Sequence, residues 1–142
     1  MTTTITVCTT CRQDRDDPNP IRDGYRLMTA LEGAAKDRED VDVRAIRCMS
    51  ACDNGCAVQI AAPGRFTYVL GDLDPVKHID DVLAFADLHA EQKSGLVPKV
   101  IRPEAIKTNV MARVAAFDLE DAPIESTDEA HARVAELTNA AE

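Results

Sequence analysis

Five cysteines are the residues of this chain whose type and spacing allow chemistry, and they fall into two groups. The first group is the Cys-x2-Cys pair of Cys8 and Cys11. The second is a Cys-x3-Cys-x3-Cys run made of Cys48, Cys52 and Cys56. Buried structural cysteines behave as small hydrophobic residues and scatter through a core. Two tight groups therefore indicate a shared site for thiolates.

Converging thiolates repel one another unless they oxidise or a cation neutralises them, and a soft metal centre meets this need. Four thiolates suit either tetrahedral zinc or an iron–sulfur cluster. A zinc ribbon usually has two tight Cys-x2-Cys knuckles, whereas this chain has one, and its wider Cys-x3-Cys loop favours the larger cluster. The sequence predicts a cluster, with zinc bound for metal handling or sensing as the alternative.

Thiol redox chemistry is a second alternative, because Cys8-Thr9-Thr10-Cys11 follows a predicted strand as a thioredoxin-type motif would. In that chemistry a helix N-terminus lowers the pKa of the nucleophilic thiol. Residues 12–18 separate the motif from the next predicted helix, so we expect no enzyme, with a dithiol oxidoreductase as the lesser alternative. A disulfide framework is not expected either, since the number of cysteines is odd.

Two predicted strands must bring the cysteine groups together. Residues 4–8 and 41–48 are rich in β-branched residues, and a helix is predicted between them over residues 20–37. Asn19 is the expected N-cap of that helix, and Pro20 its first residue. A strand–helix–strand unit makes a parallel pair, so both cysteine groups should lie at one end of the sheet. The expected buried face of the helix consists of Ile21, Tyr25, Met28, Leu31 and Ala35.

A β-hairpin and a second helix follow. Residues 57–62 and 65–70 read as strands joined by a Pro63-Gly64 turn, and Asp74-Pro75 is expected to open the helix. Gly95 is its expected stop. The order β-α-β, then hairpin, then helix predicts the α/β class with a thioredoxin-like fold and a C-terminal arm. The expected apolar face of this helix consists of Val76, Ile79, Val82, Leu83 and Ala86.

The expected organisation is a thioredoxin-like domain over residues 1–95, an arm and a tail. The arm, residues 96–116, should be ordered against the domain or a partner, with a short helix over 103–114. The tail, residues 117–142, carries −7 of the formal net charge of −9. Ser126 and Glu129 have the spacing of a capping box, which predicts a short helix in this tail.

Composition excludes several classes of partner. The domain has no basic footprint for nucleic acid. An apolar run of about 18 residues is also lacking, so we expect no membrane partner. The first residues lack the basic and apolar regions of a signal peptide, which predicts a cytoplasmic location.

The cysteine loop carries a resemblance to a known family. The run Cys48-Met49-Ser50-Ala51-Cys52-Asp53-Asn54-Gly55-Cys56-Ala57-Val58, with the hairpin and helix after it, resembles the thioredoxin-like [2Fe-2S] ferredoxins. It also resembles the related subunit of respiratory complex I. The stretch from Cys8 to about Val114 is similar to a family of small bacterial proteins described only as predicted metal-binding, of unknown function.

The resemblance implies a [2Fe-2S] cluster near the surface, favoured over [4Fe-4S], in an electron-transfer protein whose redox partner is unknown. It also implies a homodimer. Position by position, the ligands would be Cys8, Cys11, Cys48 and Cys52. Cys56 stands where those ferredoxins have proline, so all five cysteines are candidate ligands.

Other polar residues near the cysteines or in the helices are expected to be structural or solvated. Arg12 and Arg47 flank the cysteines and are expected at the surface, with neutralisation of a cluster's negative charge as the alternative. The three histidines, His78, His89 and His131, are expected at the surface and not as ligands. No catalytic residues are predicted, since no Ser-His-Asp set or phosphate loop is present.

Overall fold

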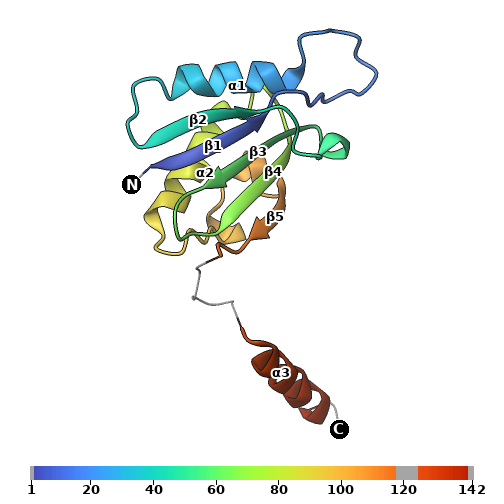
Figure 1. Cartoon of the computed structure of the whole chain (residues 1–142), viewed down its shortest axis with the longest axis vertical. Helices are drawn as coiled ribbons and strands as arrows, with labels where there is room; N and C mark the ends of the chain where they lie inside the picture. Colours follow the sequence, from blue (N-terminus) through green and yellow to red (C-terminus); the bar gives the residue numbers. More distant parts are fainter. Residues whose placement is uncertain (1, 118–124, 141–142) are drawn as a thin grey trace.

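A computed structural model describes residues 2–117 and 125–140 of the chain. Five strands form one sheet in the order β2-β1-β3-β4-β5 (Figure 1). The strands are β1 (Thr3–Cys8), β2 (Val41–Ile46), β3 (Cys56–Ala61), β4 (Thr67–Leu73) and β5 (Val110–Val114). Strands β1 and β2 run parallel, and the other neighbours are antiparallel. The predicted parallel pair and hairpin are both present.

Two helices provide the second layer of the fold. Helix α1 (Asp23–Ala34) connects β1 to β2, and α2 (Ile79–Glu91) follows β4. Both helices contribute to the main apolar core with the sheet. Alternate residues of each strand point to one side, so this core lies on one face of the sheet. Its fully buried members include Ile5, Val7, Leu27, Leu31, Val58, Ile60, Val82 and Phe85.

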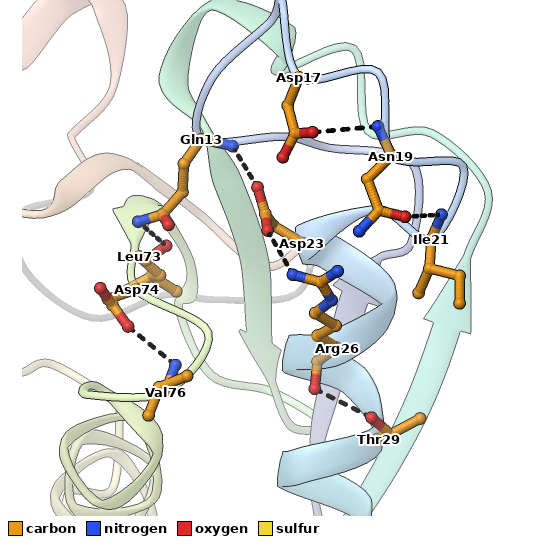
Figure 2. Close-up of polar contacts among 10 residues, drawn as sticks. All are labelled: Gln13, Asp17, Asn19, Ile21, Asp23, Arg26, Thr29, Leu73, Asp74 and Val76. Atoms are coloured by element: carbon orange, nitrogen blue, oxygen red, sulfur yellow. Dashed lines mark hydrogen bonds and ion pairs between the residues drawn. The ribbon is translucent and has the colours of Figure 1, made fainter.

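Helix α1 begins later than the sequence predicts. Its N-cap is Arg22, and not Asn19. The Asn19 carboxamide instead accepts a hydrogen bond from the Ile21 N–H at 3.0 Å, in a turn that precedes the helix (Figure 2). Ile21 and Tyr25 are consequently 55% and 49% exposed, so their predicted burial is wrong. Leu27 fills the core in their place, beside the correctly predicted Leu31 and Ala35.

Helix α2 shows the same kind of delayed start. The Asp74 carboxylate accepts hydrogen bonds from the N–H groups of Val76 and Lys77, at 2.8 and 2.9 Å. These bonds close a turn that precedes the helix, and Figure 2 shows the first of them. Val76 is therefore 81% exposed, against expectation. The rest of the predicted face packs inward, since Val82, Leu83 and Ala86 are buried and Ile79 contacts the core.

The arm contains a strand where the sequence predicts a helix. Two 3-10 turns, Lys99–Ile101 and Glu104–Ile106, lead into β5, which pairs with β4. Pro98 and Pro103 each precede one of these turns and interrupt any longer helix. The Asn109 side chain then donates to the Gly71 carbonyl at 2.9 Å, which aligns β5 with the sheet edge. Val97 and Ile106 are fully buried, so the arm packs on the core of its own chain.

Helix α3 (Thr127–Ala140) lies in the acidic tail. Its capping box is confirmed, because the Glu129 N–H donates to the Ser126 hydroxyl at 3.1 Å and Glu129 accepts from the Ser126 N–H at 3.5 Å. The tail carboxylates Asp118, Glu120, Asp121 and Glu142 lie outside the described residues. In the described ranges, no helix has both the length and the apolar character needed to cross a membrane.

One histidine is in the core, and its predicted surface position is wrong. His89 is fully buried near the end of α2, with Nε2 2.6 Å from the Phe66 carbonyl oxygen. The guanidinium of Arg65 donates to the carbonyls of His89 and Ala90 at 2.9 and 2.6 Å. His89 is buried because the hairpin and the chain after α2 fold over the end of the helix. His131 is exposed, and half-buried His78 accepts a hydrogen bond from a backbone N–H.

Candidate metal centre

Strand β1 delivers the first cysteine pair to one end of the sheet. Cys8 ends β1 directly beside Ile46, the last residue of β2. The chain then turns, and the Thr9 N–H donates to the Ile46 carbonyl at 3.0 Å. This turn brings the Cys11 sulfur to 3.0 Å from the Cys8 sulfur. The two thiols are 1% and 2% exposed, so they form a buried pair in direct contact.

The loop after β2, residues 47–55, covers this pair. The Thr10 hydroxyl donates to the Arg47 carbonyl at 2.5 Å and ties the two segments together. Ala51 is buried in a small apolar cluster with Cys8, Cys11 and Ala57, separate from the main core. The same loop carries Cys48 and Cys52, both of which are exposed. A buried cysteine pair therefore lies next to a loop that presents two more cysteines to solvent.

Cys56 lies in different surroundings from the other four cysteines. It is the first residue of β3, is fully buried, and belongs to the main apolar core. The structure thus joins the buried pair to the loop of Cys48 and Cys52, and places Cys56 among the core residues behind them. Which of the five cysteines bind a metal remains a prediction.

The backbone of the cysteine loop directs an N–H group at sulfur. The Ser50 N–H donates to the Cys48 sulfur at 3.2 Å. Ser50 has a φ of +56°, in the left-handed region that costs a residue with a side chain about 1–2 kcal/mol. Gly55 closes the loop with a φ of +60°, where glycine is tolerated without that penalty. Hydrogen bonds to ligand sulfurs are one of the means by which proteins tune a cluster's potential.

Helix α1 begins against the buried pair, which contradicts the prediction that residues 12–18 hold it away. The Gly24 N–H donates to the Cys11 carbonyl at 2.9 Å, and a Cβ on Gly24 would collide with the Cys8 carbonyl oxygen. Residues 12–22 form a loop that extends away from Cys8 and Cys11 and then folds back against them at the start of α1. Figure 2 shows how the Asp23 carboxylate accepts the Gln13 N–H at 2.9 Å, which holds the loop against the helix start.

The pKa values of the two buried thiols are shifted in opposite directions. Burial alone would raise the pKa of Cys8, but hydrogen bonds from the Cys11 thiol and from Thr10 and Met49 lower it overall. Burial, together with the bond to Cys8, raises the pKa of Cys11 to about 12. Burial and the negative charge of Asp23 raise the pKa of Cys56 to about 12 as well. The first proton of the pair is therefore held less tightly than the second, which a bound metal ion would have to displace.

Arginines line the space beside the cysteines. A hollow of about 140 Å³ lies between Cys11 and Cys52, and its other lining residues are Thr10, Arg12, Arg15 and Arg22. Arg47 is exposed as predicted, but Arg12 is half-buried, and its Nε has no hydrogen-bond partner among the described residues. Sequence reasoning did not identify Arg15 and Arg22, because only the return of the 12–22 loop places them here.

The described cysteines do not form a preassembled site for a single ion. Within residues 2–117 and 125–140, no three cysteine, histidine or carboxylate side chains are placed to hold one metal ion. Cys8 and Cys11 are in contact, and Cys11 and Cys52 line the same hollow. The cysteines at this end of the sheet supply the thiolate donors that both structural zinc and iron–sulfur clusters use.

Comparison with known proteins confirms the predicted fold. A similar solved structure is that of a thioredoxin-like [2Fe-2S] ferredoxin from Aquifex aeolicus, with a TM-score of 0.52 and 17% sequence identity. The match covers 83% of this chain and 97% of that chain. The α/β fold is therefore thioredoxin-like, as the order of the elements predicts. No curated protein matches the sequence significantly. Residues 5–116 match the model of the DUF1636 family, whose members are described as proteins of unknown function. The chain therefore belongs to that family.

Proposed function

We propose that this chain binds a [2Fe-2S] cluster through Cys8, Cys11, Cys48 and Cys52 and serves in electron transfer. The observation that carries the proposal is the contact of Cys8 and Cys11, 3.0 Å apart and buried, beneath a loop that bears two exposed cysteines. The thioredoxin-like fold, which this chain shares with a protein described as a [2Fe-2S] ferredoxin, supports the same conclusion.

Each part of the site would have its own role. The bound cluster supplies one-electron redox chemistry. Cys8 and Cys11, which lie in a small apolar cluster, would hold it together with Cys48 and Cys52, which are exposed. The Ser50 N–H donates to the Cys48 sulfur and stabilises negative charge there. Cys56, in the main core, stabilises β3 by packing.

The experiment that tests the proposal is metal analysis of protein purified without oxygen. Iron, sulfide and zinc are counted on one sample, with absorption and EPR spectra. We expect stoichiometric iron and sulfide, visible sulfur-to-iron bands and a reduced EPR signal of a two-iron centre. About one zinc per chain and no colour would contradict the proposal and support the metal-handling alternative.

Two matched variants test the assignment of ligands. Cys52→Ala should lose most of the iron and sulfide, because it removes an exposed thiolate of the loop. Cys56→Ala should retain both and lose about 1 kcal/mol or less of stability, since it removes only one buried sulfur from the core. Loss of the cluster in Cys56→Ala with retention in Cys52→Ala would overturn the assignment.

A dithiol oxidoreductase is a second candidate, and one observation favours it. The lowered pKa of Cys8, the raised pKa of Cys11 and the nearby start of α1 resemble a nucleophilic and a resolving thiol. Burial of both sulfurs opposes it, because a disulfide substrate cannot reach Cys8 while the 47–55 loop covers it. Catalytic reduction of a small disulfide that is lost in Cys8→Ala would establish this activity. A homodimer also remains a prediction, which light scattering tests.

A further inference from the structure

A larger hollow adjoins the candidate metal centre. Its volume is about 460 Å³, and we call it the α1 groove because it lies at the start of that helix. It shares Thr10 and Arg22 with the hollow between Cys11 and Cys52. A molecule seated in the α1 groove would therefore lie next to the cysteines. The residues that line the groove are Thr9, Thr10, Pro20, Ile21, Arg22 and Tyr25.

Part of the α1 groove is apolar and open to solvent. Ile21 and Tyr25 are both about half exposed, and Pro20 is exposed beside them. The turns at Asp17 and Asn19 hold this segment away from the core (Figure 2). Aromatic residues are enriched in protein interfaces, and neighbouring exposed apolar side chains mark contact sites.

Two arginines line the hollows beside the apolar part of the groove: Arg22 lines both hollows, and Arg12 lines only the one between Cys11 and Cys52. Arg22 donates from Nη1 to the Thr10 carbonyl at 2.9 Å, which fixes its guanidinium at the boundary of the two hollows. Neither Arg22 nor Arg12 pairs with a carboxylate in the part of the chain that the structure describes, whereas Arg15 pairs with Asp53. No carboxylate lines either hollow.

We propose that the α1 groove is the docking site for an acidic polypeptide segment of the redox partner. An apolar side chain of that segment would pack on Pro20, Ile21 and Tyr25, and its carboxylates would pair with Arg22 in the groove and with Arg12 in the adjoining hollow. Guanidinium groups suit carboxylates because both are planar and bind in a two-bond fork. On a chain whose net charge is −9, Arg12 and Arg22 would fix where the carboxylates of such a segment bind. The proposal rests on the proposed electron transfer.

Two synthetic nonapeptides provide the probe. Both contain one leucine and one phenylalanine, and they differ only in carrying four glutamates or four glutamines. Binding to the full-length protein is measured by fluorescence anisotropy at low and at high salt. We expect the glutamate peptide to bind at least about tenfold more tightly at low salt, and to lose most of this advantage at high salt, where exposed charges are screened.

Single variants locate the binding. Arg12→Gln and Arg22→Gln should each weaken the glutamate peptide by about threefold or more, because each removes a charge-assisted pair. Tyr25→Ser should weaken both peptides. Arg44→Gln is the matched control, since Arg44 is exposed on β2, pairs with Asp42 and lines neither hollow. This control should bind as the natural protein does.

Several outcomes would overturn the docking site. The first two are equal binding of the two peptides and binding of the glutamate peptide that Arg12→Gln and Arg22→Gln leave unchanged. The other two are displacement of the glutamate peptide by inorganic phosphate at equal ionic strength and self-association of the protein that blocks peptide binding. Iron and sulfide are counted on the same samples. A protein that binds the peptide without a cluster contradicts electron transfer alone, and a loaded protein that ignores the peptide contradicts the docking site alone.

Discussion

The two ends of the sheet bury polar side chains in different ways. At the hairpin end, which comprises Arg65, Phe66, His89 and Gly95, the Arg65 guanidinium and His89 Nε2 contact backbone carbonyls of the same chain, while His89 Nδ1 has no hydrogen-bond partner among the described residues. Arg65 donates to two carbonyls at the end of α2, and His89 contacts a third carbonyl through Nε2. At the cysteine end, which comprises Cys8, Cys11 and the 47–55 loop, the two buried thiols contact each other.

Under the proposed function, this difference separates a structural site from a ligand-binding one. Buried polar groups that bind their own backbone stabilise one conformation and have little capacity left for a ligand. In the proposed site, the Cys8 and Cys11 thiols and the guanidinium groups of Arg12 and Arg22, which pair with no carboxylate among the described residues, would instead bind groups from outside the chain. Substitutions at the hairpin end should therefore change stability, and most of those at the cysteine end should change binding.

The largest expected effect is an exception at the cysteine end, where the backbone is tightly packed. Gly24→Ala should lower the free energy of unfolding by about 3 kcal/mol, because its Cβ would collide with the Cys8 carbonyl. Gly33→Ala in the same helix is the control. Nothing lies within 4 Å of a Cβ there, so it should stabilise the protein by up to about 1 kcal/mol. Equal stability of the two variants in urea unfolding would contradict the packing described.

Next in size is the loss of the charged donor at the hairpin end. Arg65→Gln should lower the free energy of unfolding by about 2 kcal/mol, since it removes the cation that binds the His89 and Ala90 carbonyls near the α2 C-terminus. Thermal unfolding followed by circular dichroism measures this loss. Metal content and peptide binding should not change. A stable variant with a lost cluster would reverse the comparison between the two ends.

The third prediction concerns pH. Burial lowers the pKa of His89, and nearby Arg65 lowers it further against the opposing bond to Phe66. The unfolded chain therefore takes up a proton below about pH 6.5 that the folded chain refuses, and stability falls as the pH drops below that value. The contribution is at most about 1.4 kcal/mol per pH unit. His89→Gln keeps a donor for the Phe66 carbonyl but does not titrate.

Denaturant unfolding between pH 5 and 7 tests this assignment. As the pH falls from 7 to 5, the natural protein should lose more stability than the His89→Gln variant. Carboxylates titrate in both proteins, but only the natural protein has the buried histidine. Parallel pH profiles for the two proteins would show that His89 accepts its proton without cost.

The smallest expected effect on stability is at the cysteine end. Arg12→Gln should change the free energy of unfolding by less than about 0.5 kcal/mol, since its guanidinium pairs with no carboxylate among the described residues and its Nε has no partner there. Differential scanning calorimetry of both proteins measures the change. A loss near that of Arg65→Gln would make Arg12 a structural residue and remove the contrast between the two ends.

The sequence predicted the elements better than their starts. The period of two in β1 and the apolar faces of both helices follow from local patterning, so Leu31, Val82 and Ala86 are buried as expected. Asn19 and Asp74 were expected to begin helices directly. Each instead binds backbone N–H groups in a preceding turn, which is an alternative use of the same side chain.

The candidate site was also predicted in part. The parallel pairing of β1 and β2 places Cys8 and Cys48 at one end of the sheet, as the strand–helix–strand order requires. The arginines beside the cysteines and the burial of His89 were not predicted. The arginines are placed by the 12–22 loop, and His89 is buried by the hairpin and the chain after α2. Neither composition nor periodicity predicts how such segments fold back onto the rest of the protein.

The sequence by itself determined that cysteines gather in two groups, that the fold is thioredoxin-like, and that the tail is acidic, because residue type, spacing and charge are local properties. Tertiary structure alone decided that Cys8 and Cys11 are buried while Cys48 and Cys52 face solvent, and that Cys56 joins the core. Burial depends on which segment covers which, and that is settled by long-range packing of the loops on the sheet.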